Sequence, residues 1–204
     1  MQSADESDIA IEELDAVVLV DYDNIKPSDE ITTKDAADNL IQIRAWVDQA
    51  LAQLPVRIRE VQFRIYGGWT DERGGFTRRG NWVLASLSHV RGLLSGVRYL
   101  PALPTSIAAK QLRLRGLYRS AGAAMIQKMV DTLMAVDAMH FCESEPIVLA
   151  IATDDDDLVP ALMAASIKTK VCKVCCLLRV RATGAAINDD GLQAEGVRIV
   201  QVGV

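Results

Sequence analysis

The sequence lacks the features that mark secreted and membrane-spanning proteins. Its 204 residues include only four cysteines, no basic-then-apolar run near the beginning that resembles a signal peptide, and no stretch approaching the roughly 20 apolar residues of a membrane span. Four cysteines without a secretory context are typical of reduced thiols. We therefore predict a cytoplasmic protein that has no membrane partner.

Internal repeats and linker-like segments are also missing after residue 15. The length and the 50% hydrophobic content suit one α/β domain that needs no disulfides. The charged fraction of 24% is close to the globular average of about 25%, which excludes disorder of the chain as a whole. We predict one domain over residues 15–204, preceded by an acidic, disordered tail over residues 1–14.

The formal net charge of -5 hides an uneven distribution of charged residues. Residues 1–15 contain six acids and no base, whereas residues 56–119 contain twelve Lys and Arg against three acids. A basic middle of this kind can bind phosphates, so the acidic total does not exclude a nucleic-acid partner. The alternative is that these bases are dispersed over a solvated surface.

Short apolar runs alternate with helical apolar patterns along the chain. We predict strands over residues 16–20, 56–66, 97–100, 147–152, 171–178 and 197–202, and helices over residues 35–53, 81–94, 123–139, 156–167 and 182–187. Continuously apolar strands are typical of parallel sheets covered on both faces, and a phase slip at Glu60 indicates a bulge. The sequence therefore predicts a three-layer α/β/α fold with a mostly parallel central sheet.

Two predicted central strands end directly in carboxylates. Residues 16–20 run into Asp21-Tyr22-Asp23-Asn24, and residues 147–152 run into Thr153 and four consecutive aspartates. Ligands of parallel sheets bind beyond the carboxyl ends of the strands. Aspartates also end strands and cap helices, but four together repel one another unless a cation neutralises them. Carboxylate oxygens favour Mg²⁺ or Mn²⁺, so we predict such a metal site.

Asp131 is a further candidate ligand in the predicted helix over residues 123–139. It lies close to the apolar stripe of that helix, where a carboxylate is costly unless it reaches a cation or another partner. An exposed helical acid is the alternative. Asp137 lies on a different side of the helix, where it is expected to cap, pair or lie near the rim. The predicted stripe consists of Met125, Met129, Leu133, Val136 and Met139.

Three segments resemble the signature motifs of the NYN family, which belongs to the PIN-like nucleases. They are Val20–Ile25 (VDYDNI), Gln127–Ala138 (QKMVDTLMAVDA) and Ala152–Leu162 (ATDDDDLVPAL), and their order and spacing match over nearly the whole of residues 15–204. The resemblance implies a PIN-like α/β/α fold and a metal-dependent ribonuclease. It also implies the metal ligands Asp21, Asp131, Asp155 and Asp157, with Asn24 and Thr153 positioning a water or a phosphate oxygen.

The third segment departs from the family pattern. Asp154 stands where the family usually has glycine, Asp156 where it has a small polar residue, and Leu158 where it has an aromatic residue. A side chain at 154 could alter the turn. A register in which Asp154 and Asp156 are the ligands therefore stays open.

The resemblance implies that one or two Mg²⁺ or Mn²⁺ ions assist phosphodiester hydrolysis, leaving a 5′-phosphate and a 3′-hydroxyl. RNA is then the expected partner, and basic side chains could hold it near the ions. The candidates are Arg78, Arg79, Lys110, Arg113, Arg115, Arg119 and Lys128. Trp69 and Tyr118 either stack on bases or, as we favour, pack in the core. The two histidines, His89 and His140, lie outside every motif.

Three alternatives remain at this stage. The altered turn at Asp154 fits an inactive PIN-like module that binds RNA or serves assembly. The Asp21-x-Asp23 pair resembles the haloacid-dehalogenase-type phosphatases, although Ile25 departs from their pattern. Cys172 and Cys175, with His140 and Cys142, invite a zinc site, but their odd spacing on a strand favours buried thiols. The RNA substrate, endo- or exonuclease action, the biological process and the oligomeric state, a homo-oligomer included, stay open.

Overall fold

The computed structural model describes residues 12–71, 75–94, 96–103, 118–121, 124–127, 130–144, 147–168, 172–180 and 189–202. Most of the predicted acidic tail lies outside these residues. Seven strands form the main sheet in the order β3-β4-β2-β1-β7-β8-β9, and six of them run parallel while β3 is antiparallel to β4. The strands are β1 (Glu13–Asp21), β2 (Arg57–Tyr66), β3 (Gly92–Leu94), β4 (Val97–Ala102), β7 (Ile147–Ala152), β8 (Cys172–Arg179) and β9 (Val197–Gln201).

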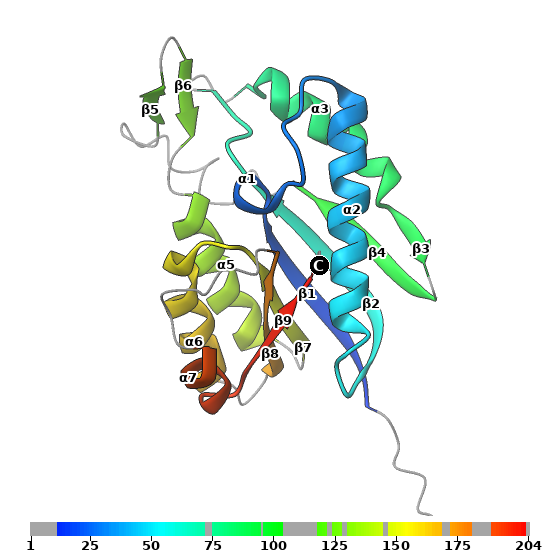
Figure 1. Ribbon diagram of the computed structural model, residues 1–204, viewed down its shortest axis with the longest axis vertical. Coiled ribbons are helices and arrows are strands. Elements are labelled where there is room, and N and C mark those ends of the chain that lie inside the picture. The colour runs from blue at the N-terminus through cyan, green and yellow to red at the C-terminus, as the bar shows by residue number, and fades with distance from the viewer. Residues whose placement is uncertain are drawn as a thin grey trace, which may run out of the picture.

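Helices cover both faces of this sheet (Figure 1). One layer contains α2 (Thr33–Leu51) and α3 (Arg78–Ser86), and the other contains α5 (Val130–Ser144), α6 (Val159–Ile167) and α7 (Asp189–Ala194). The short helix α1 (Tyr22–Ile25) follows β1, and 3₁₀ turns span Leu87–His89 and Asp156–Leu158. A separate hairpin pairs β5 (Tyr118–Ala121) with β6 (Ala124–Gln127). The predicted three-layer α/β/α architecture is confirmed.

The strand order reverses between β1 and β7. From β1 the chain builds outward through β2 to β4, and it then returns to β7 on the other side of β1 before adding β8 and β9. In open parallel sheets, ligands bind at such a reversal, in the crevice between the loops that follow the two central strands. We use the word crevice for this place, where Asp21 ends β1 and Thr153 follows β7.

The core explains why β1 is apolar without alternation. Ala16, Val18 and Val20 belong to the cluster that contains the buried side of α2, whereas Val17 and Leu19 belong to the cluster on the α5 and α6 side. Successive side chains of a strand point to opposite faces, so a strand covered on both faces needs apolar residues at every position.

The predicted bulge in the second strand is present. Leu14 pairs with Ile58 and Ala16 with Val61, so Arg59 and Glu60 of β2 together lie opposite the single residue Asp15. The Arg59 guanidinium donates from Nε to Oδ1 of Asp15 over 2.9 Å.

Two predicted helices are wrong in their extent. The helix expected over residues 123–139 begins only at Val130, because residues 124–127 pair with β5 as strand β6. The buried stripe of α5 includes Met134, Ala138 and Cys142, whereas Val136 is 60% exposed. Local apolar spacing cannot reveal this difference, because the pairing strand decides it.

The helix expected over residues 81–94 is also shorter. It begins at Arg78, where the Thr77 side chain accepts a hydrogen bond from the backbone N–H of Gly80 over 3.0 Å, and it ends at Ser86. Gly92 has a φ of +116°, which a helix cannot accommodate, and residues 92–94 form the antiparallel edge strand. The short helix expected over residues 182–187 lies outside the described residues.

No helix in the described part of the chain is long and apolar enough to cross a bilayer.

Candidate metal centre

Three of the predicted ligands meet at the crevice between β1 and β7. Asp21 ends β1, Asp131 lies in the first turn of α5, and Asp155 follows β7. One carboxylate oxygen from each lies within 4.8 Å of the others. They come from three distant segments of the chain, so the fold rather than the local sequence brings them together.

Asp21 is the most enclosed of the three, with 1% of its surface exposed. Its Oδ2 accepts hydrogen bonds from Asn24 Nδ2 at 2.6 Å and from Thr153 Oγ1 at 2.7 Å. Thr153 Oγ1 in turn accepts from the backbone N–H of Asp155 at 2.9 Å. Asn24 and Thr153 therefore orient the first ligand, and Thr153 also connects it to the loop that carries Asp155.

The carboxylates repel one another in the absence of a cation. Burial raises the pKa of Asp21 to about 6, and the nearby charges of Asp131 and Asp23 add to this rise, whereas the hydrogen bonds from Thr153 and Asn24 oppose it. Partial loss of solvent also raises the pKa of Asp131, although its side chain is exposed on one side, and the charges of Asp155, Asp157 and Asp23 raise it further. A hard divalent cation would relieve this repulsion, and the all-oxygen donor set fits Mg²⁺ or Mn²⁺.

Asp157 lies outside the group of three. It is exposed at the 3₁₀ turn, and its backbone N–H donates to Oδ1 of Asp155 over 2.9 Å. Its charge is nevertheless close enough to raise the pKa of Asp131. The structure thus brings three of the four predicted ligands together, whereas the fourth, Asp157, is exposed to solvent beside them.

Asp154 and Asp156 turn away from this group, toward the end of β8. Oδ1 of Asp154 accepts a hydrogen bond from the backbone N–H of Val180 over 2.9 Å, and Asp156 pairs with the guanidinium of Arg179. In the described residues it is Asp155 that joins Asp21 and Asp131. Arg179 was not among the site residues predicted from the sequence, although a charged residue at the end of an apolar strand was the available signal.

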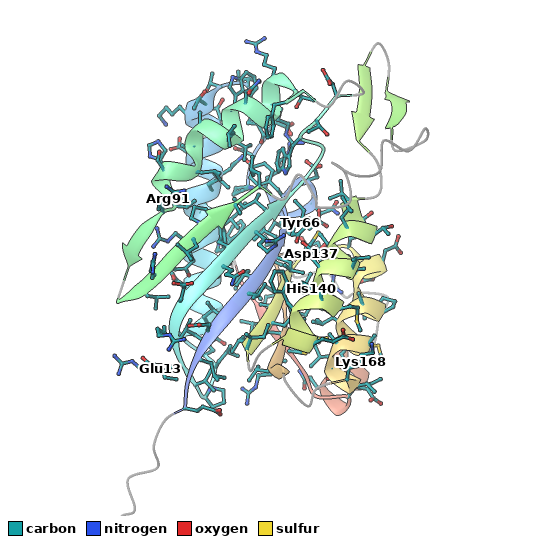
Figure 2. All side chains as sticks on the ribbon, turned by 180° about the vertical axis from the view of Figure 1, so that it is seen from behind. Glu13, Tyr66, Arg91, Asp137, His140 and Lys168 are labelled. Carbon is teal, nitrogen blue, oxygen red and sulfur yellow. The ribbon has the colours of Figure 1, made fainter. Side chains whose placement is uncertain are left out.

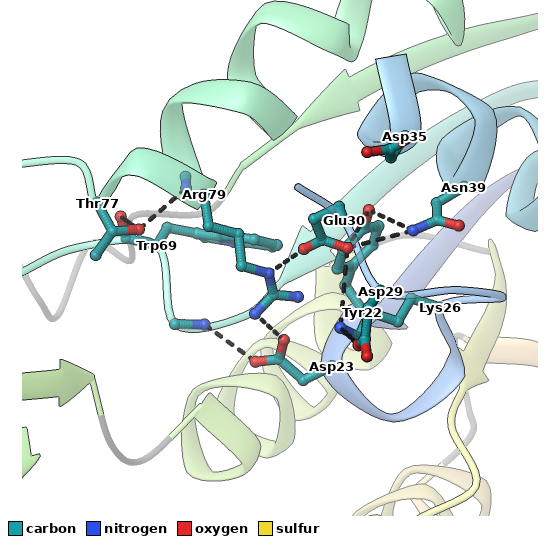
Figure 3. A network of polar contacts seen from close by, with 12 residues as sticks. Tyr22, Asp23, Lys26, Asp29, Glu30, Asp35, Asn39, Trp69, Thr77 and Arg79 are labelled. Carbon is teal, nitrogen blue, oxygen red and sulfur yellow. Dashed lines mark hydrogen bonds and ion pairs between the residues drawn. The ribbon is translucent and has the colours of Figure 1, made fainter. Parts of the chain in front are cut away.

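Arg79, expected to contact RNA, lies instead in an internal network. Its guanidinium forms ion pairs with Asp23 and Glu30 and lies 5.3 Å from the ring centroids of Tyr22 and Trp69. Figure 3 shows this guanidinium between the two carboxylates, with Trp69 alongside. Trp69 is 1% exposed and donates from Nε1 to the Ile65 carbonyl, so it packs in the core, as favoured from the sequence.

Of the other side chains predicted to contact RNA, the structure describes only that of Arg78. Arg78 is exposed, and its Cζ lies 4.9 Å from the ring centroid of Trp82. Arg119 and Tyr118 belong to β5, but their side chains are outside the described part of the structure. The remaining candidates, Lys110, Arg113, Arg115 and Lys128, also lie outside the described residues.

Glu30 is a structural residue that the sequence did not reveal. Only 9% of its surface is exposed, and its Oε2 accepts hydrogen bonds from Asn39 Nδ2 at 3.2 Å and from the Tyr22 hydroxyl at 3.4 Å. With its ion pair to Arg79, Glu30 ties the loop after α1 to α2 and α3 (Figure 3). Because α1 carries Asp23 and Asn24, this network supports one side of the candidate site.

Replacing Glu30 with glutamine should lower the free energy of unfolding by about 2 kcal/mol, because the buried Glu30 carboxylate loses its charge-assisted hydrogen bond to Arg79. Urea unfolding followed by circular dichroism measures this change. The matched control is Asp38→Asn, which removes an exposed carboxylate paired with Lys34 and should leave stability unchanged. Equal stability of Glu30→Gln and the unaltered chain would show that the network is not stabilising.

Asp137 pairs with β2, one of the roles expected for it. Arg64 Nη2 donates to its Oδ2 over 2.8 Å, and the Tyr66 hydroxyl donates to the same oxygen. Figure 2 shows Tyr66 and Asp137 next to each other. These contacts fasten α5, the helix that carries Asp131, to the sheet.

The burial of the cysteines indicates reduced thiols rather than a zinc site. Cys142, Cys175 and Cys176 are buried thiols, and burial raises the pKa of Cys176 to about 12. The side chain of Cys172 lies outside the described residues. Of the His, Cys, Asp and Glu side chains that the structure describes, those grouped for metal binding are the three aspartates.

No protein-family model, no curated protein and no solved structure matches the chain. The resemblance to the NYN family therefore stays a prediction from the three motifs, and the candidate site rests on the geometry of its own residues.

Proposed function

We propose that the protein is a ribonuclease that hydrolyses RNA phosphodiester bonds with Mg²⁺ or Mn²⁺. One observation carries the proposal: oxygens of Asp21, Asp131 and Asp155 lie within 4.8 Å of one another at the reversal of strand order, where parallel sheets bind ligands. The resemblance of the three surrounding motifs to the NYN family supports the same activity.

The roles of the side chains follow from their contacts. Asp21, Asp131 and Asp155 would hold the cation, and Asp157 would bind it through water or help to hold a second one. Asn24 and Thr153 both donate to Oδ2 of Asp21, which leaves Oδ1 as the oxygen that could face a cation. A bound ion would supply hydroxide from a coordinated water and stabilise charge on the attacking and leaving oxygens.

The exposure of the site suits a polymeric substrate. Asp21 is enclosed, but Asp131 and Asp157 are exposed and Asp155 is half-buried, so one side of the group faces solvent. Lys128 follows the basic stretch of residues 56–119 and precedes Asp131 by three residues in the sequence. A polyanion approaching the carboxylates would be attracted by these bases.

A phosphatase that uses Asp21 as nucleophile and Asp23 as acid is less well supported. Oδ2 of Asp23 accepts from the backbone N–H of Gly68 over 3.2 Å, and Oδ1 pairs with Arg79. Both oxygens of Asp23 are therefore engaged in structural contacts, whereas a general acid needs an oxygen that reaches the leaving group.

Incubation of the full chain with 5′-labelled single-stranded RNA tests the proposal. We expect cleavage with Mn²⁺ or Mg²⁺, none with EDTA, and a loss of about 100-fold or more in Asp155→Asn. Asp38→Asn, which lies on exposed α2 surface, should cleave like the unaltered chain. RNA that binds but stays intact with both ions would support the inactive module instead. Phosphate release from a phosphomonoester without RNA cleavage would support the phosphatase.

A further inference from the structure

We propose that Arg179 is a positioning residue of the metal centre. It holds the segment Thr153–Asp157 in the register that turns Asp155, rather than Asp154 or Asp156, toward Asp21 and Asp131. The inference rests on the proposed function, because it assigns a role toward the same cation.

Arg179 is a buried cation at the end of β8, with 6% of its surface exposed. The pairing of Ala152 with Leu178 brings it beside the turn that leaves β7. Its Nη2 pairs with the Asp156 carboxylate, and its Nη1 donates to the carbonyl of Thr153 over 3.4 Å. The Arg179 side chain therefore contacts the turn at two points.

The backbone around Arg179 binds the same turn. The N–H of Thr153 donates to the Leu178 carbonyl over 3.2 Å, and the N–H of Val180 donates to Oδ1 of Asp154 over 2.9 Å. Three consecutive residues of the β8 end therefore contact the turn. Together they define which of its side chains face β8.

The contacts of the turn divide its side chains into two sets. Asp154 and Asp156 contact the end of β8, while Thr153 contacts Asp21 and Asp155 lies with Asp21 and Asp131. A slip by one residue would bring Asp155 or Asp157 beside Arg179 in place of Asp156. It would also move the Thr153 hydroxyl away from Asp21 and the Thr153 carbonyl away from Arg179.

Arg179 also acts on the first ligand through Thr153. The residue whose carbonyl it contacts is the one whose hydroxyl donates to Asp21 and accepts from the N–H of Asp155. Arg179 itself contacts none of the three grouped carboxylates in the bonds described here. Its influence on a cation is therefore indirect, like that of other residues that orient metal ligands.

Calorimetric titration of the full-length protein with Mn²⁺, without RNA, tests this role. We expect Arg179→Gln to weaken Mn²⁺ binding about 10-fold, and Arg179→Lys, which keeps the charge, to stay within about threefold of the unaltered chain. Asp156→Asn should weaken binding about threefold although Asp156 is no ligand. The double variant should resemble Arg179→Gln, because Arg179→Gln already removes the pair with Asp156.

Lys168→Gln is the matched control, since it removes one positive charge from a surface ion pair with Glu143. It should bind Mn²⁺ normally, and the Mn²⁺ paramagnetic resonance spectrum should change only in the Arg179 and Asp156 variants. Unaltered affinity in folded Arg179→Gln, or in Asp156→Asn if the former does not fold, would overturn the positioning role alone. Absence of Mn²⁺ binding by the unaltered chain would overturn the proposed function and this role with it.

Discussion

Replacing Asp21 with asparagine should lower metal-dependent RNA cleavage by about 100- to 1000-fold while the protein stays folded. The new side chain has one acceptor oxygen, and the surrounding donors determine where that oxygen lies. The Thr153 hydroxyl already accepts from the N–H of Asp155, so its proton points to residue 21. The asparagine oxygen must take the place of Oδ2, and its NH₂ group then occupies the position of Oδ1.

This orientation explains why the loss should be large without unfolding. An NH₂ group at the position of Oδ1 donates hydrogen bonds to carboxylates but cannot bind a cation. Cleavage rates over a range of Mn²⁺ concentrations, with thermal melts in EDTA, separate the two effects. Asp38→Asn serves as the control for the removal of a carboxylate. An Asp21→Asn protein that cleaves RNA at the normal rate would show that Asp21 is not a ligand.

The stability of the metal-free protein should fall between pH 4 and pH 7 because of Asp21. Its pKa is about 6 in the folded chain against an ordinary 3.8, so the folded state binds this proton more tightly than the unfolded state does. The associated stability is fully present below pH 3.8 and is lost as the pH rises through about 6. The difference of about two pKa units corresponds to about 3 kcal/mol.

Urea unfolding in EDTA at several pH values measures this loss. The curve of Asp21→Asn should lack the part of the pH dependence that Asp21 contributes, and subtraction of the two curves largely cancels the other carboxylates. Mn²⁺ at pH 7 should restore stability to the unaltered chain but not to Asp21→Asn. Parallel curves for the two proteins would contradict the raised pKa.

The sequence predicts the two strand ends of the site for a physical reason. A central parallel strand is apolar at every position, so the first carboxylate after it is conspicuous, as at Asp21 and at Thr153–Asp157. Asp131 was predicted to lie inside a longer helix, but it lies in the first turn of α5. Residues 124–127 fit a helix locally, and only their pairing with β5 makes them a strand.

Long-range partners explain what the sequence could not predict. Arg79 and an exposed arginine look alike in a sequence, because the partners Asp23 and Glu30 lie about fifty residues earlier in the chain. The register of the aspartates is hidden for a similar reason. Nothing in four consecutive aspartates shows which of them joins Asp21 and Asp131, because the partner of Asp156 is Arg179 on the neighbouring strand.

The position of the crevice between the two halves of the sheet has a consequence for protein synthesis. Asp21 and Thr153 touch although 132 residues separate them, and Arg179 follows later still. A nascent chain that has left the ribosome only as far as β4 has Asp21 but neither Asp131 nor Asp155. The carboxylates can therefore assemble only after most of the domain has been translated, so an incomplete chain cannot form the candidate metal centre on which the proposed activity depends.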